Sequence, residues 1–294
     1  MIEVFFRYEF LQNAFFTGIM IGFLAPLLGV FLVVRRLSLI ADALSHVTLT
    51  GIAFSLLLGK HYVFFQALNP LYMGIAFSVG GSLLIERLRS IYKYYQELAI
   101  PIILSSSIGI GVVFISLANG FNNDLFNYLF GSVIAVSRSD LWTILIITIV
   151  VTIVIILLYK ELFFLAFDEE QATVLGIKKN MLHFIFIVIV ALVIAASMRV
   201  VGILLVSALM TLPVAASMRL AKGFKQMFVY AIIFGEISVI IGLVSAFHLD
   251  VAPGGTIVII SVLILLGVMS YDWFRGKLYQ SKSSRNKTRE TKVG

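Results

Sequence analysis

Residues 39–51 read Leu-Ile-Ala-Asp-Ala-Leu-Ser-His-Val-Thr-Leu-Thr-Gly, an apolar stretch that carries an acid, Asp42, and an imidazole, His46. Basic residues at Arg36 and Lys60 bracket this stretch, so we interpret it as one membrane-spanning helix. Side chains four positions apart lie on one face of such a helix. A charge near the centre of a bilayer costs about 2.5–3.5 kcal/mol, so two ionisable groups on one face favour a functional site over packing.

The pair predicts a site on an ion path. At about 1.5 Å per residue, His46 lies roughly 15 Å from Arg36, about half of a ~30 Å hydrocarbon core. An oxygen and a nitrogen ligand at that depth indicate a divalent transition metal in transit. One copy supplies two ligands where zinc usually takes four, so a two-fold dimer with this helix at its axis would complete the site. The alternative is a structural hydrogen bond to Asp42 from a hydroxyl such as Ser45 or Thr48 of a neighbouring helix.

The composition of the whole chain predicts a polytopic membrane protein. Of its 294 residues, 61% are hydrophobic and 13% are charged, and the mean hydropathy is +1.06. The absence of cysteine excludes disulfides and thiolate metal sites. The net charge of +7 does not predict nucleic-acid binding, because the basic residues lie in short loops and the tail. No cleavable signal peptide is expected at the N-terminus. The chain lacks a Gly-x-x-x-x-Gly-Lys-Ser/Thr phosphate loop, so it is not expected to hydrolyse ATP itself.

Apolar runs predict an all-α bundle of eight or nine spans. They are residues 10–34, 39–58, 63–85, 98–118, 141–158, 181–198, 200–218, 227–247 and 256–270. The basic residues then alternate between the two sides, which places the N-terminus outside and the C-terminus in the cytoplasm. Arg199 falls on the outer side and indicates a re-entrant or broken helix. We assign residues 1–276 to the membrane domain and 277–294 to a basic, disordered cytoplasmic tail.

Two connectors carry helix signals. Residues 123–131 mix aromatics with amides and predict a short interfacial helix on the outer side, ended by its last glycine. Residues 168–176 on the cytoplasmic side have an acidic N-cap at Asp168, a glutamine at Gln171 and a terminating glycine at Gly176. Two helical turns are too few to be stable alone in water, so we expect this helix to dock onto a partner.

Three further side chains are candidates for the pathway. Glu236 is a second mid-membrane acid, about 16 Å from Lys225 along a helix. It is open whether Glu236 is a third metal ligand, a proton partner or a group that holds a neighbouring helix by hydrogen bonding. His248 and Asp250 precede a Pro-Gly-Gly turn on the outer face. They form either a metal capture point or an ordinary turn.

In order and content, several stretches resemble the membrane subunit of bacterial ABC importers for zinc, manganese and iron, the ZnuB-like metal permease family. The matching stretches are residues 35–46, 124–131, 168–177, 201–216 and 249–255. The resemblance implies a homodimeric permease of the type II ABC importer kind in the bacterial inner membrane. It further implies two cytoplasmic ATP-binding subunits and an extracellular metal-binding protein as partners. Eight spans are common in this family, which disfavours the ninth.

The resemblance also implies roles for particular residues. Asp42 and His46 inherit a place on the metal path. The coupling helix that fits the ATPase is matched by Asp168, Glu169, Glu170, Gln171 and Gly176. No permanent cofactor is expected. Zinc is the expected substrate, because Val-Thr-Leu-Thr-Gly follows His46, and manganese or iron import by the same mechanism is the alternative. The rivals are a proton-coupled carrier or channel in which Asp42 and Glu236 relay protons, and a structural or sensory membrane protein without flux.

Overall fold

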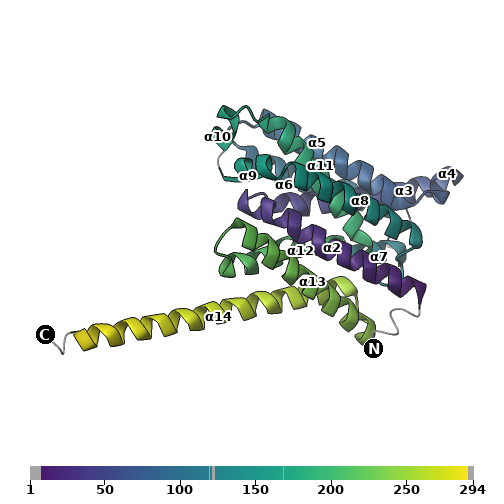
Figure 1. Cartoon of the computed structure of the whole chain (residues 1–294). Helices are drawn as coiled ribbons and strands as arrows, with labels where there is room; N and C mark the ends of the chain where they lie inside the picture. Colours follow the sequence, from purple (N-terminus) through teal and green to yellow (C-terminus); the bar gives the residue numbers. More distant parts are fainter. Residues whose placement is uncertain (1–7, 119, 121–122, 168, 291–294) are drawn as a thin grey trace.

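The structure, a computed structural model, describes residues 8–118, 120, 123–167 and 169–290, and in these it is all-helical, without strands (Figure 1). Eight helices in this part of the chain are long and apolar enough to cross a membrane, as predicted. They are α2 (Glu9–Val34), α3 (Leu39–His61), α5 (Pro70–Ile91), α6 (Ala99–Leu117), α8 (Arg138–Leu157), α11 (Lys179–Val201), α13 (Phe224–Leu249) and α14 (Pro253–Glu290).

The ninth predicted span is α12 (Ile203–Leu220), whose apolar part is shorter than the others. It begins after Gly202, beside the end of α7 (Asn123–Phe130). It ends beside the end of α2, because Met218 lines a cavity with the last residues of that helix. At about 1.5 Å per residue its 18 residues cover about 27 Å, so α12 also joins the two ends of the bundle.

One end of the bundle, which we call the α7 end, is a tight backbone junction. Here α7, the α11–α12 junction and the start of α14 meet. Gly131 and Gly202 both have left-handed φ angles, +77° and +84°. A Cβ on Gly131 would lie 2.2 Å from the carbonyl oxygen of Val200, and one on Gly254 would lie 1.9 Å from that of Val201. Only glycine fits such approaches, so the break predicted near Arg199 falls at Gly202.

The opposite end, which we call the α10 end, carries the short helices α9 (Tyr159–Phe167) and α10 (Glu169–Val174). The ends of α2, α5 and α12 and the starts of α3, α11 and α13 also lie here. Most loop cations collect at this end: Arg35, Arg36, Arg87, Arg89, Lys93, Lys160, Lys178, Lys179, Arg219, Lys222 and Lys225. The small elements α4 (Val63–Ala67) and η1 (Gln96–Leu98) complete the described chain.

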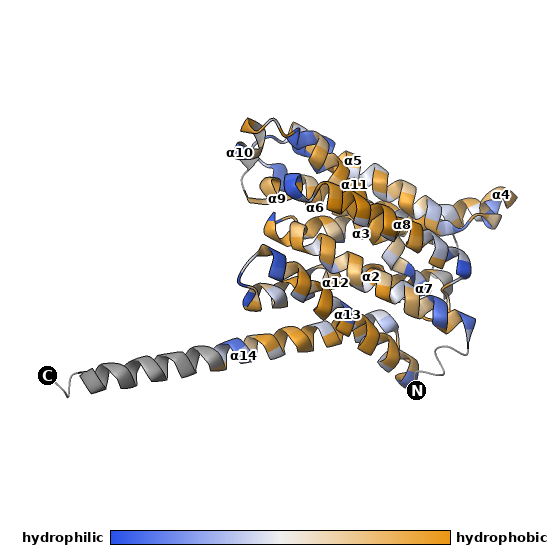
Figure 2. Cartoon of the chain, viewed as in Figure 1, coloured by the Kyte–Doolittle hydropathy of each residue, from blue (hydrophilic) through white to orange (hydrophobic). Residues whose placement is uncertain are grey.

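The core sits around α2, α3 and α11, which are the most buried of the long helices, whereas α8 and α14 are the least. Small residues let these backbones approach closely, as is common in membrane bundles. A Cβ on Gly29 of α2, for example, would lie 1.9 Å from the carbonyl oxygen of Met210 in α12. The outer helices expose many isoleucine, leucine and valine side chains (Figure 2), which suits a lipid environment.

Both predicted short helices are present. α7 covers Asn123–Phe130 and ends at Gly131; buried Leu125 and Tyr128 pack one side of it into the α7 end, and Phe126 and Phe130 are exposed on the other. α14 continues as a helix to Glu290 and extends away from the bundle (Figure 1). Its side chains from residue 275 onward are not described, and the disorder expected for 277–294 stays a prediction.

Candidate metal pathway

Neighbouring helices hold α3 on most of its surface. Glycines of α5 press against Val47 and Thr48, since a Cβ on Gly81 would lie 2.7 Å from the Val47 side chain. On another side, the Thr50 hydroxyl donates to the carbonyl of Ser107 in α6 at 2.8 Å. These contacts determine which side of α3 remains open.

The remaining face of α3 carries Asp42 and His46. Leu39 is 62% exposed, and Asp42, His46 and Leu49 are all partly exposed. Their spacing of three and four residues places the four side chains in one stripe along the helix. The structure therefore brings the acid and the imidazole together on one face, as predicted, and leaves that face uncovered by its own chain.

Neither side chain has a polar partner within the described residues: the carboxylate of Asp42 and the imidazole of His46 make no hydrogen bond and no ion pair there. The hydroxyls named as structural partners are used elsewhere. Ser45 Oγ donates to the carbonyl of Ala41 at 2.8 Å, and Thr48 Oγ1 donates to that of Leu44 at 2.6 Å. A hydroxyl has one proton to donate, so neither is left for Asp42. The chain thus leaves two polar side chains of an apolar bundle without a partner among its described residues, which is typical of a site on an ion path.

The position of the pair along α3 differs from the sequence estimate. Arg36 adopts a left-handed turn (φ 56°), and α3 begins only at Leu39. Along the helix, Asp42 then lies about 4.5 Å and His46 about 10.5 Å from its start. The centre of this 23-residue helix is near Thr50. The pair therefore lies in the first half of α3, and the rise from Arg36 to His46 is shorter than 15 Å because the residues directly after Arg36 do not rise as a helix. Its depth in a membrane stays a prediction.

Glu236 stands apart from this pair. It occupies the middle of α13 and is half-buried at the crossing with α2, where a Cβ on Gly22 would lie 3.2 Å from its Oε2. Among the described residues, no group of three or more His, Asp or Glu side chains lies close enough to hold a metal ion. One copy of the chain therefore brings together Asp42 and His46 but does not add Glu236 to them.

His248 and Asp250 lie at the α7 end, where α13 stops. His248 is exposed, and its Nδ1 lies 2.8 Å from the carbonyl oxygen of Val244, so this nitrogen carries the proton that is donated. Asp250 is the C-cap of α13, with φ 53° and its backbone N–H bonded to the carbonyl of Ala246. The turn accounts for the position of Asp250, and a capture role for either side chain stays a prediction.

The coupling stretch folds as α10, which projects at the edge of the bundle (Figure 1). Its end is as predicted: Gly176 has φ +78°, and the backbone N–H groups of Leu175 and Ile177 bond back into the helix. Val174 and Leu175 are 88% and 62% exposed. Asp168 lies outside the described residues, as do the side chains of Glu169 and Glu170. An exposed apolar tip on a short helix suits docking onto a partner.

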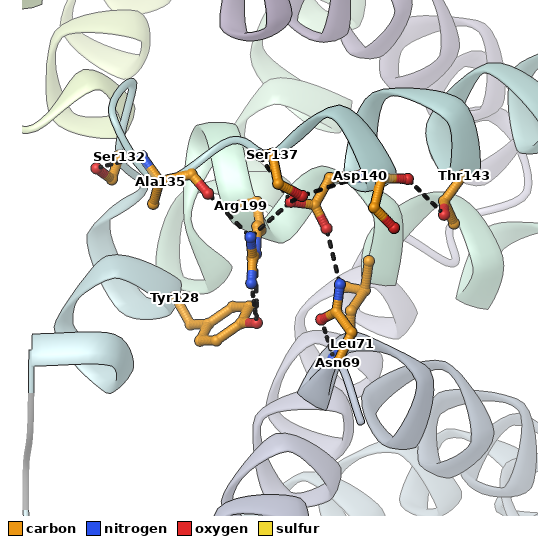
Figure 3. A network of polar contacts seen from close by, with 10 residues as sticks. Asn69, Leu71, Tyr128, Ser132, Ala135, Ser137, Asp140, Thr143 and Arg199 are labelled. Carbon is orange, nitrogen blue, oxygen red and sulfur yellow. Dashed lines mark hydrogen bonds and ion pairs between the residues drawn. The ribbon is translucent and has the colours of Figure 1, made fainter. Parts of the chain in front are cut away.

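A buried charge network at the α7 end was missed from the sequence (Figure 3). Arg199, near the end of α11, points between Tyr128 of α7 and Asp140 of α8. Its Nη1 donates to Asp140 Oδ2 at 2.5 Å and to the carbonyl of Ala135 at 2.9 Å, and its Nη2 donates to the Tyr128 hydroxyl at 3.0 Å. Arg199 thus ties three helices together.

Asp140 is fully buried, and both of its oxygens are used. Oδ2 also accepts from the backbone N–H of Ser137 at 2.9 Å, and Oδ1 accepts from Asn69 at the start of α5 at 3.0 Å. Ser137 and Asp140 form a capping box at the start of α8. In the sequence, the Ser-x-x-Asp spacing indicates the capping box at the start of α8. The pairing of Asp140 with Arg199 has no such local signal, because it forms only when α8 packs against α11.

A bundle of membrane-crossing helices with an acid and an imidazole on one partly exposed face has the form of a membrane transport subunit. The chain belongs to the ABC 3 transport family, whose model matches residues 7–272. This confirms the predicted family and fold class, and in such transporters ATP hydrolysis belongs to a separate subunit.

Relatives match over nearly their whole length. The chain is 37% identical to a "Probable metal transport system membrane protein" of Treponema pallidum, over 90% of this chain and 96% of that protein. It is 32% identical to the "Manganese transport system membrane protein MntC" of Listeria monocytogenes, over 96% and 97%. Among solved structures it is similar to "PsaBC from Streptococcus pneumoniae in complex with Fab", with a TM-score of 0.79, 29% identity and coverage of 91% and 93%.

Proposed function

We propose that this chain is the permease subunit of an importer for a divalent transition metal, driven by ATP-hydrolysing partner subunits. The observation that carries the proposal is the pair Asp42 and His46, which share an uncovered face of α3 and have no polar partner among the described residues. An acid and an imidazole without thiolates bind such metals moderately, as a carrier must in order to release them. The names of these relatives, which describe metal and manganese transport, support metal as the cargo.

The assembly that follows is a homodimer with two cytoplasmic ATP-binding subunits and an extracellular metal-binding protein. A two-fold axis beside the open face of α3 brings two copies of Asp42 and His46 together, with two oxygen and two nitrogen ligands. The α10 end is the cytoplasmic end, because the loop cations collect there. The N-terminus then lies outside, and the chain is a multi-pass protein of the bacterial inner membrane.

Transport follows from this arrangement. The binding protein releases the ion at the α7 end, and the ion descends to Asp42 and His46, which hold it between the centre of α3 and its α10 end. Movement of the ATP-binding subunits reaches the bundle through α10, which packs against α9 and α11. The affinity of the site for the ion must fall between the two states, since otherwise the ion would not be released.

Manganese is the cargo that we favour. The zinc expectation rested on the residues after His46, whereas relatives over nearly the full length of the chain carry manganese in their names. An acid and imidazole site accepts both metals, so zinc remains the second candidate.

The test is accumulation of manganese, zinc and iron, measured element by element, in a strain that lacks this chain and then regains it. We expect manganese to fall and to recover on return of the chain. If only zinc accumulation falls and recovers, zinc is the cargo and manganese is not. If the accumulation of no metal changes, the proposal of metal import is refuted. Uptake that stops when the proton gradient is collapsed at constant ATP would instead support a proton-coupled carrier.

A further inference from the structure

The α10 end holds a second polar feature that the proposed transport path does not use. A hollow of about 540 Å³ lies between the end of α5 and the start of α11. Among the described residues, its lining carries five cations and one acid: Arg35, Arg87, Arg89, Lys93, Lys179 and Glu86. We call it the basic hollow. Hydrophilic residues gather on this end of α5 in Figure 2.

The single acid does not neutralise the basic hollow. Glu86 Oε2 lies 3.0 Å from Nε2 of buried His183 and 3.8 Å from Arg89. Arg35 Nη2 lies 2.9 Å from Nδ1 of the same histidine. The guanidinium of Arg89 also lies against Nε2 of this ring, so two arginines and Glu86 surround His183. Among the described lining residues, Arg87, Arg89 and Lys93 thus outnumber the one carboxylate by two charges, and their mutual repulsion favours binding of an anion.

The surroundings place the basic hollow at the depth of lipid headgroups. The connector after α5 exposes three tyrosines, Tyr92, Tyr94 and Tyr95. Exposed tyrosines mark the membrane–water interface. The α5 helix itself is mostly unburied within the chain and thus faces lipid along much of its length.

One wall of the basic hollow is apolar. Leu83 and Phe184 line it and are 43% and 40% exposed, and the adjacent Leu84 and Met181 are 57% and 58% exposed. A free phosphate ion would not contact this apolar wall. A phospholipid would contact both the cations, through its phosphate, and the apolar wall, through its acyl chains.

We propose that the basic hollow binds the phosphate of an anionic phospholipid, whose acyl chains lie along Leu83 and Phe184. Guanidinium groups match phosphate oxygens through paired hydrogen bonds. Basic pockets between membrane helices are a known way to hold acidic headgroups. The bound lipid links the ends of α2 and α5 to the start of α11, the helix that follows α10, and so stabilises the end of the bundle to which α10 is attached.

The test is native mass spectrometry of the purified full chain in detergent, titrated with phosphatidylglycerol, phosphatidylcholine or inorganic phosphate. The variant is Arg87→Gln with Lys93→Gln, since both side chains are exposed and their loss leaves the contacts of His183 intact. Each cation near an acidic headgroup contributes about fivefold in affinity, so we expect about 30-fold weaker binding of phosphatidylglycerol. The matched control is Arg219→Gln with Lys225→Gln, which removes the same charge at the same end outside the basic hollow.

Preference for phosphatidylglycerol over phosphatidylcholine, lost in the first variant and kept in the control, supports the proposal. Equal binding of the two lipids overturns it, as does equal loss in both variants, which would indicate diffuse charge. Inorganic phosphate that displaces the lipid at equal concentration would show a free-phosphate site. A first variant that binds lipid normally but loses the ATP-binding subunits would show that the basic hollow meets an acidic protein surface.

Discussion

Two of the charged groups inside this apolar bundle, one at the α7 end and one on α3, differ in their partners. At the α7 end, Arg199 and buried Asp140 satisfy one another and engage Tyr128 and backbone groups as well. On α3, Asp42 and His46 have no polar partner among the described residues and lie on an uncovered face. Both cost free energy to place in a membrane. We infer from this difference that charges paired within the chain stabilise the fold, whereas charged side chains without a partner in the chain bind the transported ion.

The largest effect is expected where the paired group is broken. Asp140→Ala leaves Arg199 without its carboxylate, and loss of one partner of a buried pair costs about 3–5 kcal/mol. We expect little folded chain in detergent, measured by gel filtration of the extracted membrane fraction. The double variant Asp140→Leu with Arg199→Met removes both charges and should recover most of the folded chain, because apolar replacement of a buried pair is often neutral.

The two results must come together. If Asp140→Ala folds normally but stops transport, the network belongs to the pathway and the comparison between the two groups fails. If the amount of folded chain stays low in the double variant, the hydrogen bonds from Arg199 to Tyr128 and Ala135 stabilise this end of the bundle instead.

Next in size is the loss of a ligand on α3. Asp42→Asn and His46→Gln should each lower metal uptake by at least about 100-fold, the upper end of the effect seen even for groups that only support a ligand. The amount of folded chain should not change, because neither side chain holds another residue in the described structure. Uptake of the radioactive or isotopically enriched metal into cells measures the first quantity and gel filtration the second.

Leu49→Met is the matched control, because Leu49 lies on the same face of α3 and the substitution leaves the charge unchanged and the side-chain volume nearly so. Normal uptake in Asp42→Asn would refute the pathway. A fall in folded chain equal to that of Asp140→Ala would place the pair with the structural charges.

A smaller effect is expected at α10. Leu175→Ser removes an exposed apolar side chain, and burial of such a side chain at an interface contributes about 1.5 kcal/mol or more, roughly tenfold in affinity. We expect about tenfold less ATP-binding subunit to copurify, with the amount of permease unchanged. Leu249→Ser at the α7 end is the control, because Leu249 is 68% exposed and lies at the opposite end. Equal loss in the two variants would argue against docking through α10.

Much of the fold and part of the site could be predicted from the sequence, for reasons visible in particular residues. Apolar runs are local, so the spans and the shared face of Asp42 and His46 follow from spacing alone. The position of the pair along α3 could not be predicted, because the left-handed turn at Arg36 delays the start of the helix to Leu39 and has no clear signal in the sequence. The partner of Arg199 was missed because it is 59 residues away in sequence and is reached only through packing of α8 on α11.

Glu236 sharpens the comparison most, although its expected effect is the smallest. Like Asp42, it makes no hydrogen bond among the described residues, yet it sits at the crossing of α2 and α13, against Gly22, rather than on the open face of α3. If an absent partner alone marks a functional charge, Glu236→Gln should abolish uptake as Asp42→Asn does. If access from an uncovered face is also required, the loss should stay within about fivefold, roughly 1 kcal/mol. We expect the second result, because one chain does not bring Glu236 to the pair.

Gly22→Ala, which would press a methyl group against the same carboxylate, then separates the effect of crowding at this crossing on uptake from the effect of losing the charge.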